Sequence, residues 1–118
     1  MNTGSNVLPI SRYDTLLYDI TLEQKSSVTG EVAPLITGVV TSFISLWPPS
    51  LTPIAGTDVV MSHAGDGRWL GEIPDQFMNS ALSSIADNTP VAVIYTVNGS
   101  MVRYREAVIA AIKRSEAL

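Results

Sequence analysis

The fold of this chain is decided by residues 62–74, which read Ser-His-Ala-Gly-Asp-Gly-Arg-Trp-Leu-Gly-Glu-Ile-Pro. The Gly65-Asp66-Gly67 centre predicts a tight hairpin turn, because glycine accepts the positive φ angles that such turns require. The residues after the turn predict a strand over 68–73 with Trp69 and Ile73 on its inner face. The Asn98-Gly99 pair is a second hairpin signal. Two such turns in one short chain favour an antiparallel β-sheet.

Alternating apolar residues extend this interpretation along the chain. The segment 16–24 alternates strictly, which places Leu16, Tyr18, Ile20 and Leu22 on one inward face. The segment 35–47 is apolar on both faces, which indicates a strand covered on both sides or a bulge near Gly38. Further strands are predicted over 58–63, 68–73, 91–97 and from 100 to about 111, with 91–97 as a central strand.

One short helix is predicted near residues 75–85. Asp75 is the expected capping residue, and Phe77, Leu82 and Ile85 follow at roughly helical spacing. The fold class predicted from these patterns is mainly β, an antiparallel β-sandwich with one short helix. We expect a single β-sandwich domain over 13–112, preceded by an extended arm over 1–12 and followed by a charged tail over 113–118.

The arm and one loop are the predicted contact regions. Proline keeps the arm extended rather than helical, so its apolar patch docks either on the chain's own body or on a partner. The proline-rich loop that follows residue 47 is long for a compact domain, and we interpret it as a contact loop. The predicted interface residues are Val7, Leu8, Pro9, Ile10, Pro48, Pro49, Leu51 and Ile54.

Composition narrows the function classes. The chain has 118 residues, 46% of them hydrophobic, and no cysteine, which leans toward folding inside a cell and removes thiolate chemistry. A net charge of −4 with only seven Lys and Arg argues against nucleic acid as a partner. No apolar run reaches the roughly 18–20 residues of a membrane span, and residues 1–6 lack the basic start of a signal peptide. We therefore expect no nucleic-acid and no membrane partner.

Catalytic and metal-binding patterns are weak. His63 is the only histidine, and no G-x-S-x-G nucleophile motif accompanies it, so we interpret it as a surface residue beside the turn. Asp58 and Asp66 bracket it without the spacing of a known metal motif, and Asp66 suits the turn by itself. Glu72 and Asp75 complete the set of nearby carboxylates, for which a solvated sheet edge is the favoured interpretation. The sequence thus predicts no enzyme, no metal and no cofactor.

Aromatic and basic residues leave alternatives open. The four aromatics that offer a carbohydrate-stacking surface are Trp47, Trp69, Tyr95 and Tyr104. Aromatic residues on strands lie more often in a core or an interface, and the core is favoured here. Arg103 and Arg105 point the same way from one strand, where they form either an anion contact or simply an exposed sheet face; the latter is favoured.

The order of these signals resembles a known group of proteins. The hairpin G-D-G-R-W-L-G-E-I-P, the helix D-Q-F-M-N-S-A-L and the strand V-A-V-I-Y-T-V before an N-G turn are similar to small immunoglobulin-like β-sandwich proteins of tailed-bacteriophage virions. The match covers roughly residues 35 to 110. It runs through Gly65, Gly67, Trp69, Ile73, Pro74, Thr96 and Gly99, which are turn and core residues without a catalytic signature.

The resemblance implies a function and a location. The expected role is a non-enzymatic structural component of the virion, made in the host cytoplasm and assembled in multiple copies at the neck, tail or fibre-attachment region. Its expected partners are further copies of itself, as a homo-oligomer, and other virion proteins. The alternatives are a head-decoration (cement) protein of the capsid and a carbohydrate- or peptide-binding β-sandwich module.

Overall fold

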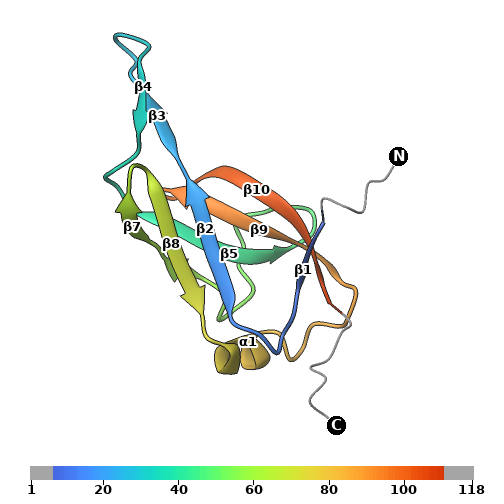
Figure 1. The fold of residues 1–118 in the computed structure, drawn as a ribbon. Coiled ribbons are helices and arrows are strands. Elements are labelled where there is room, and N and C mark those ends of the chain that lie inside the picture. Colours follow the sequence, from blue (N-terminus) through green and yellow to red (C-terminus); the bar gives the residue numbers. More distant parts are fainter. Residues whose placement is uncertain (1–6, 111–118) are drawn as a thin grey trace.

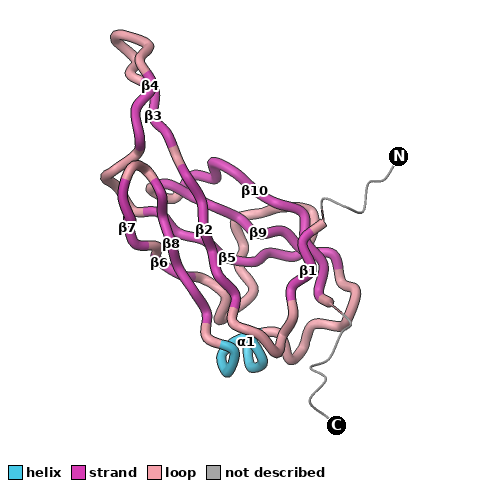
Figure 2. Tube along the Cα trace, viewed as in Figure 1, coloured by secondary structure: helices cyan, strands magenta, loops and turns pink. Residues whose placement is uncertain are grey.

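The computed structural model describes residues 7–110, which form strands and one short helix (Figures 1 and 2). In chain order the elements are β1 (Leu8–Ile10), β2 (Leu16–Thr21), β3 (Glu23–Lys25), β4 (Val32–Pro34), β5 (Val40–Leu46), β6 (Val59–Val60), β7 (Ser62–Gly65), β8 (Arg68–Ile73), α1 (Asp75–Ala81), β9 (Pro90–Val97) and β10 (Ser100–Ile109). The prediction of a mainly β fold with one short helix is confirmed.

The strands form three sheets. Sheet A has the order β1-β10-β9-β5-β6, sheet B has the order β2-β8-β7, and β3 pairs with β4 alone. Nearly all pairings are antiparallel, as the two hairpin signals predict, but β1 runs parallel to β10, with Leu8 beside Ala107 and Ile10 beside Ile109. The expectation of a purely antiparallel fold is therefore wrong at this edge, because the N-terminal arm belongs to neither hairpin and pairs with the last strand.

Both predicted turns are confirmed by their backbone angles. Asp66 and Gly67 have φ angles of 51° and 82°, and Asn98 and Gly99 have φ angles of 50° and 90°. Two consecutive positive φ angles are the geometry of the two-residue hairpin loop whose twist matches that of the flanking strands. The turns set the register of β7 with β8 and of β9 with β10.

Three predicted strands have different limits in the structure. The segment 16–24 is divided at Leu22 into β2 and β3, and the segment 35–47 becomes regular only at Val40, after Gly38 turns with a φ of 110°. The segment 58–63 is divided at Met61, where the chain leaves sheet A and enters sheet B. In the first and third segments the chain continues into a second strand with a different pairing partner, and a local pattern does not report that change of partner.

Sheets A and B enclose one apolar core. The inward set predicted for β2 is confirmed, since Tyr18, Ile20 and Leu22 are buried, and β9 is buried on both faces as expected of a central strand. Trp69 is buried, and its indole Nε1 donates a hydrogen bond to the Leu35 carbonyl at 3.0 Å. The core residues contributed by sheet A include Val40, Ile44, Val91, Val93, Ala107 and Ile109, and those from sheet B include Tyr18, Ile20, Trp69 and Ile73.

The helix differs from its prediction in three respects. It ends at Ala81 instead of extending to residue 85, and Pro74 rather than Asp75 occupies the N-cap position, without a side-chain capping bond. The Asp75 carboxylate instead accepts a hydrogen bond from the Gln76 N–H within the first turn. Phe77 is exposed, while Met78 takes the fully buried position facing the core. Leu82 is fully buried and Ile85 packs against the core, as predicted, so only Phe77 departs from the expected apolar face.

Residues 23–34 project from the two-sheet body as a separate β-hairpin, which we call the finger (Figure 1). Every residue of the finger is exposed. At its base the Leu22 N–H donates to the Gly67 carbonyl at 2.8 Å, and the Leu35 N–H donates to the Leu22 carbonyl at 2.9 Å. The finger is thereby fixed to the same hairpin turn that residues 62–74 predict.

Gly67 offers a test of this junction. A Cβ on Gly67 would lie 2.5 Å from the Leu22 carbonyl oxygen, whereas a Cβ on Gly99, at a similar φ, would meet nothing within 4 Å. Gly99→Ala should therefore cost only the roughly 1–2 kcal/mol of a left-handed backbone. Gly67→Ala should lower the free energy of unfolding by at least about 1 kcal/mol more, because backbone must move as well. Urea unfolding of the two variants measures the difference, and equal losses would contradict the packed junction.

Candidate interaction surfaces

His63 has a structural place beside the turn. Its Nε2 accepts a hydrogen bond from the Gly67 N–H at 3.1 Å, and its ring lies 5.0 Å from the Trp69 ring. The histidine thus holds the loop in shape, which agrees with the interpretation of a turn-flanking residue.

The carboxylates singled out in the sequence do not converge. Asp66 sits at the tip of the turn with its positive φ, whereas Asp58 precedes β6, Glu72 lies on β8 and Asp75 begins α1. Among residues 7–110 no group of three or more His, Asp or Glu side chains is placed to hold a metal ion. Within the same residues no helix is long and apolar enough to cross a membrane.

Tyr18 connects the two sheets, and the pKa of its hydroxyl is strongly shifted. Its hydroxyl donates to the Thr57 carbonyl at 2.8 Å, and its ring meets the Tyr95 ring edge-on at 6.4 Å. Burial raises the pKa of the Tyr18 hydroxyl well above its ordinary value of 10.0, and Tyr95 and Asp58 act in the same direction. Burial is also the main cause that raises the pKa of Tyr95, against the lowering effects of a hydrogen bond to the Asp19 backbone and then of Arg105 and Arg103.

The four aromatic residues separate into two pairs. Trp69 is in the core and Tyr95 is half-buried against it, as the favoured interpretation predicts. Trp47 and Tyr104 lie together at the surface, 38% and 52% exposed, with ring centroids 6.1 Å apart and an interplanar angle of 63°. For this second pair the core interpretation was wrong, because both rings lie at the margin of a sheet face that sheet B does not cover.

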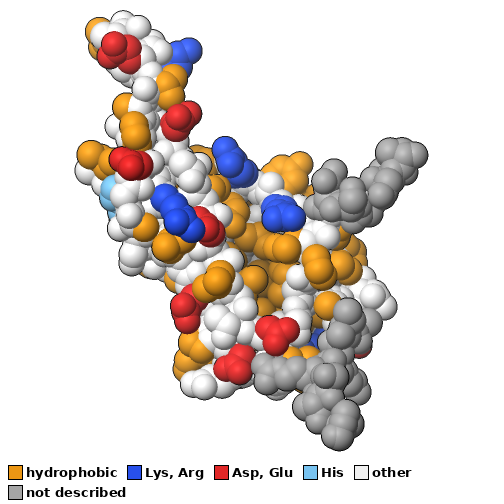
Figure 3. Space-filling view, viewed as in Figure 1, with side chains coloured by type: hydrophobic (Ala, Val, Ile, Leu, Met, Phe, Trp, Pro, Cys, Tyr) orange, Lys and Arg blue, Asp and Glu red, His pale blue; other side chains and the backbone are white. Residues whose placement is uncertain are grey.

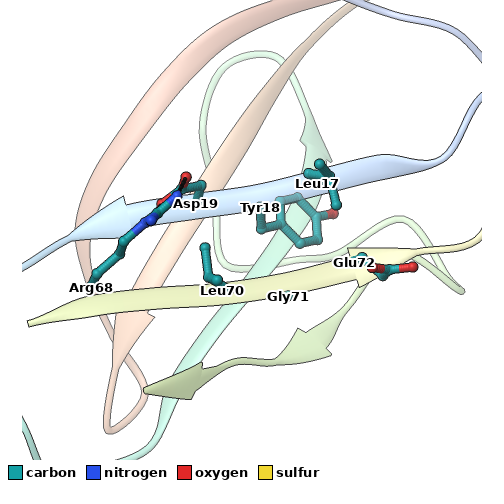
Figure 4. Close-up of a pocket in the computed structure, with 7 residues that line it drawn as sticks. All are labelled: Leu17, Tyr18, Asp19, Arg68, Leu70, Gly71 and Glu72. Atoms are coloured by element: carbon teal, nitrogen blue, oxygen red, sulfur yellow. Dashed lines mark hydrogen bonds and ion pairs between the residues drawn. The ribbon is translucent and has the colours of Figure 1, made fainter. Parts of the chain in front are cut away.

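A shallow hollow lies on the outer face of sheet B, between β2 and β8 (Figure 4). Its volume is about 420 Å³, and its lining residues are Leu17, Tyr18, Asp19, Arg68, Leu70, Gly71 and Glu72. Arg68 spans the two strands and binds Asp19 through two hydrogen bonds of 3.1 and 2.7 Å, which lowers the pKa of the Asp19 carboxyl. With its carboxylate held in an ion pair and two exposed leucines beside it, the hollow has the composition of a contact surface.

The predicted interface residues fall into two groups. Ile10 is 1% exposed and Leu8 packs against the core, so these two arm residues serve the chain's own body, one of the two alternatives for the arm. Ile54 also packs against the core, and its N–H donates to the Ile44 carbonyl at 2.7 Å. The members that remain exposed are Pro9, Pro48 and Leu51, while Val7 and Pro49 are half-buried. The charged tail over 113–118 lies outside the described residues.

Sequence reasoning missed two surfaces. The finger was interpreted as the end of one strand and a loop, although Ser26, Thr29 and Gly30 between two short extended runs could have indicated a hairpin. The outer edge of β10 was missed altogether. Arg103 and Arg105 lie there, exposed as predicted, and beside them the parallel partner β1 reaches only residues 107–109.

No protein-family model matches this sequence, and no curated protein is significantly similar to it.

Tyr18→Phe tests the link between the sheets. Loss of the hydroxyl leaves the buried Thr57 carbonyl without its donor, which should lower the free energy of unfolding by about 1–3 kcal/mol at neutral pH. The raised pKa also has a pH consequence. The folded state keeps the Tyr18 proton above the unfolded pKa of about 10, so stability is full below that pH and declines as the pH rises.

We expect the alkaline decline to be shallower in Tyr18→Phe, with a smaller remainder from Tyr95. Urea unfolding between pH 7 and 11 measures both effects. Tyr104→Phe is the control at neutral pH, because that ring lies at the surface and should change stability by less than about 0.5 kcal/mol. If stability declines as steeply in Tyr18→Phe as in the wild type, groups other than Tyr18 cause the alkaline decline.

Proposed function

We propose that this chain is a non-enzymatic structural component of a tailed-phage virion, assembled in multiple copies at the neck, tail or fibre-attachment region. Three parts of this proposal rest on the resemblance of the hairpin, the helix and the N-G strand. They are the immunoglobulin-like class, the location in a virion and the homo-oligomeric state of the chain. The surface of the molecule supports an assembly role independently of that resemblance.

The observation that carries the assembly role is the finger. A two-stranded hairpin without a packed face is marginally stable in water by itself. Here all twelve residues of 23–34 are exposed, including Val28 at 90% and Val32 at 58%. Apolar side chains held this far from the chain's own core gain stability only when another molecule covers them. Figure 3 shows the finger standing clear of the body with hydrophobic groups along it.

The remaining surface is consistent with that role. Exposed apolar side chains recur on several faces, among them Leu17 and Leu70 beside the hollow of sheet B and Leu51 in the loop after β5. Neither the hollow nor the surroundings of His63 combines a nucleophile with a free base. Subunits of a symmetric particle meet several neighbours, so several separate contact patches are expected of them.

The test uses finger variants of the full chain. Val28→Asp combined with Val32→Asp should leave the thermal unfolding midpoint within a few degrees of the wild type, because neither side chain packs in the core. The variant should nevertheless reduce self-association or incorporation into particles by tenfold or more. Light scattering of the purified chain measures self-association, and quantitative mass spectrometry of purified particles measures copy number.

Leu51→Asp is the matched control, since Leu51 is an exposed apolar residue of the predicted contact loop. If Leu51→Asp alone prevents assembly, the loop rather than the finger forms the contact. If the chain is absent from particles made by cells that carry its gene, the virion role is wrong.

The exposed aromatic pair favours a second candidate, a carbohydrate-binding module. Aromatic rings at a surface stack on the apolar faces of sugars, and Trp47 and Tyr104 are adjacent and open. Under this alternative, Trp47→Ala should abolish glycan binding on an array while the chain stays folded. Trp69→Ala should instead lower the free energy of unfolding by about 3–5 kcal/mol, because this ring lies in the core. An array without bound glycans would remove this candidate.

A further inference from the structure

The outer edge of β10 is paired with another strand over only part of its length. β9 pairs with β10 from Ser100 to Val108 on one side, with a register shift between Met101 and Arg103, while β1 covers only Ala107 to Ile109 on the other. Within residues 7–110 the outer side of residues 100–106 has no strand beside it. An unpaired row of backbone N–H and C=O groups is a template for another strand, and β1 shows that this edge accepts one.

Two arginines mark the same edge. Register places Arg103 beside Tyr95 and Arg105 beside Val93, so both side chains lie on the face of sheet A that is turned toward sheet B. Both are exposed, and their lowering effect on the pKa of Tyr95 indicates that they stand near its hydroxyl. Figure 3 shows basic side chains at the surface in this part of the body.

Arg103 and Arg105 lack the ionic partners that Arg12 and Arg68 have. Arg12 binds Asp87 and Arg68 binds Asp19, both at 2.7 Å. Among the described residues, Arg103 and Arg105 have no ion pair or side-chain hydrogen bond. The chain as a whole carries a net charge of −4. Two unpaired positive charges, two residues apart on one free strand edge, therefore form a local site of opposite sign to the rest of the molecule.

A second copy of the same edge does not fit well. In a two-fold antiparallel pairing centred on Tyr104, Arg103 of each copy would face Arg105 of the other, and a centre on either arginine would place it opposite itself. Like charges directly across a strand pair are destabilising. The edge is thus guarded against self-pairing by its own side chains, in the manner of charged edge strands in general.

We infer that residues 100–106 of β10 bind an extended segment of another protein by strand addition, and that this segment carries acidic residues two positions apart. The acidic side chains face Arg103 and Arg105, and the residue between them lies on the other face, beside the exposed ring of Tyr104. An apolar residue suits that middle position. The inference rests on the proposed assembly role, for which it specifies the chemistry of one partner.

The probe is a blocked peptide of about seven residues that alternates glutamate with valine or threonine, and the control peptide has lysine in place of glutamate. Amide chemical shifts of the isotope-labelled full chain are recorded during titration. We expect shifts concentrated in residues 100–106, binding at least tenfold tighter for the glutamate peptide, and weakening with added salt. Arg103→Glu combined with Arg105→Glu should reverse the preference, and Arg68→Glu, which lies outside the edge, should not.

Three results would overturn the inference. The first is equal binding of both peptides, or no shift in 100–106 at millimolar peptide. The second is slow hydrogen exchange of the edge amides in the free monomer, which would mean that the chain covers its own edge. The third is protection that grows with protein concentration, which would make a second copy the occupant. Incorporation of the chain into particles is measured separately, so a failed peptide leaves the proposed function standing.

Discussion

One residue of the loop between β5 and β6, Thr57, links sheet A to sheet B through its hydrogen bonds. Its carbonyl accepts the Tyr18 hydroxyl of sheet B, while its own hydroxyl accepts the Ile44 N–H of sheet A at 3.0 Å and donates to the Ile54 carbonyl at 2.7 Å. Thr57 is fully buried, so each of these polar groups would cost about 1–3 kcal/mol without its partner. The loop, β2 and β5 must therefore reach their positions together. β6 pairs with β5 only at Thr41 and Ser42. Farther along the same edge of β5, the Thr57 side chain accepts the Ile44 N–H in place of a strand.

Local chemistry determined the elements that the sequence could predict. Asp66-Gly67 and Asn98-Gly99 need only their own φ angles to form a turn, and the burial of Tyr18 and Ile20 follows from alternation within one strand. Partner choice is different, because it depends on distant parts of the chain. Nothing near Met61 indicates that the strand changes sheets there, and nothing near Leu22 indicates that the chain leaves sheet B for the finger.

The same division applies to the surfaces. In the sequence, Trp47 and Trp69 both stand in apolar segments and cannot be told apart. In the structure, only Trp69 lies beneath a covering sheet. The exposure of Arg103 and Arg105 was predictable from their alternation with apolar neighbours. Their position on an open edge was not, because it depends on where β1 stops along β10, a contact between the two ends of the described chain.

The crossing at Met61 has a mechanical consequence. Along that side of the body the polypeptide itself connects sheet A to sheet B, and the Met61 N–H also donates to the Val40 carbonyl at 2.8 Å. Residues 11–15 also join β1 of sheet A to β2 of sheet B, and residues 74–89, which include α1, join β8 of sheet B to β9 of sheet A. The Met61 crossing therefore ties the β6 margin of sheet A to sheet B, while Tyr95 meets Tyr18 across the sheets through a ring contact. A strand bound along residues 100–106 would lie near the other margin of sheet A, so the crossing and the bound strand would stiffen this sheet from its two sides.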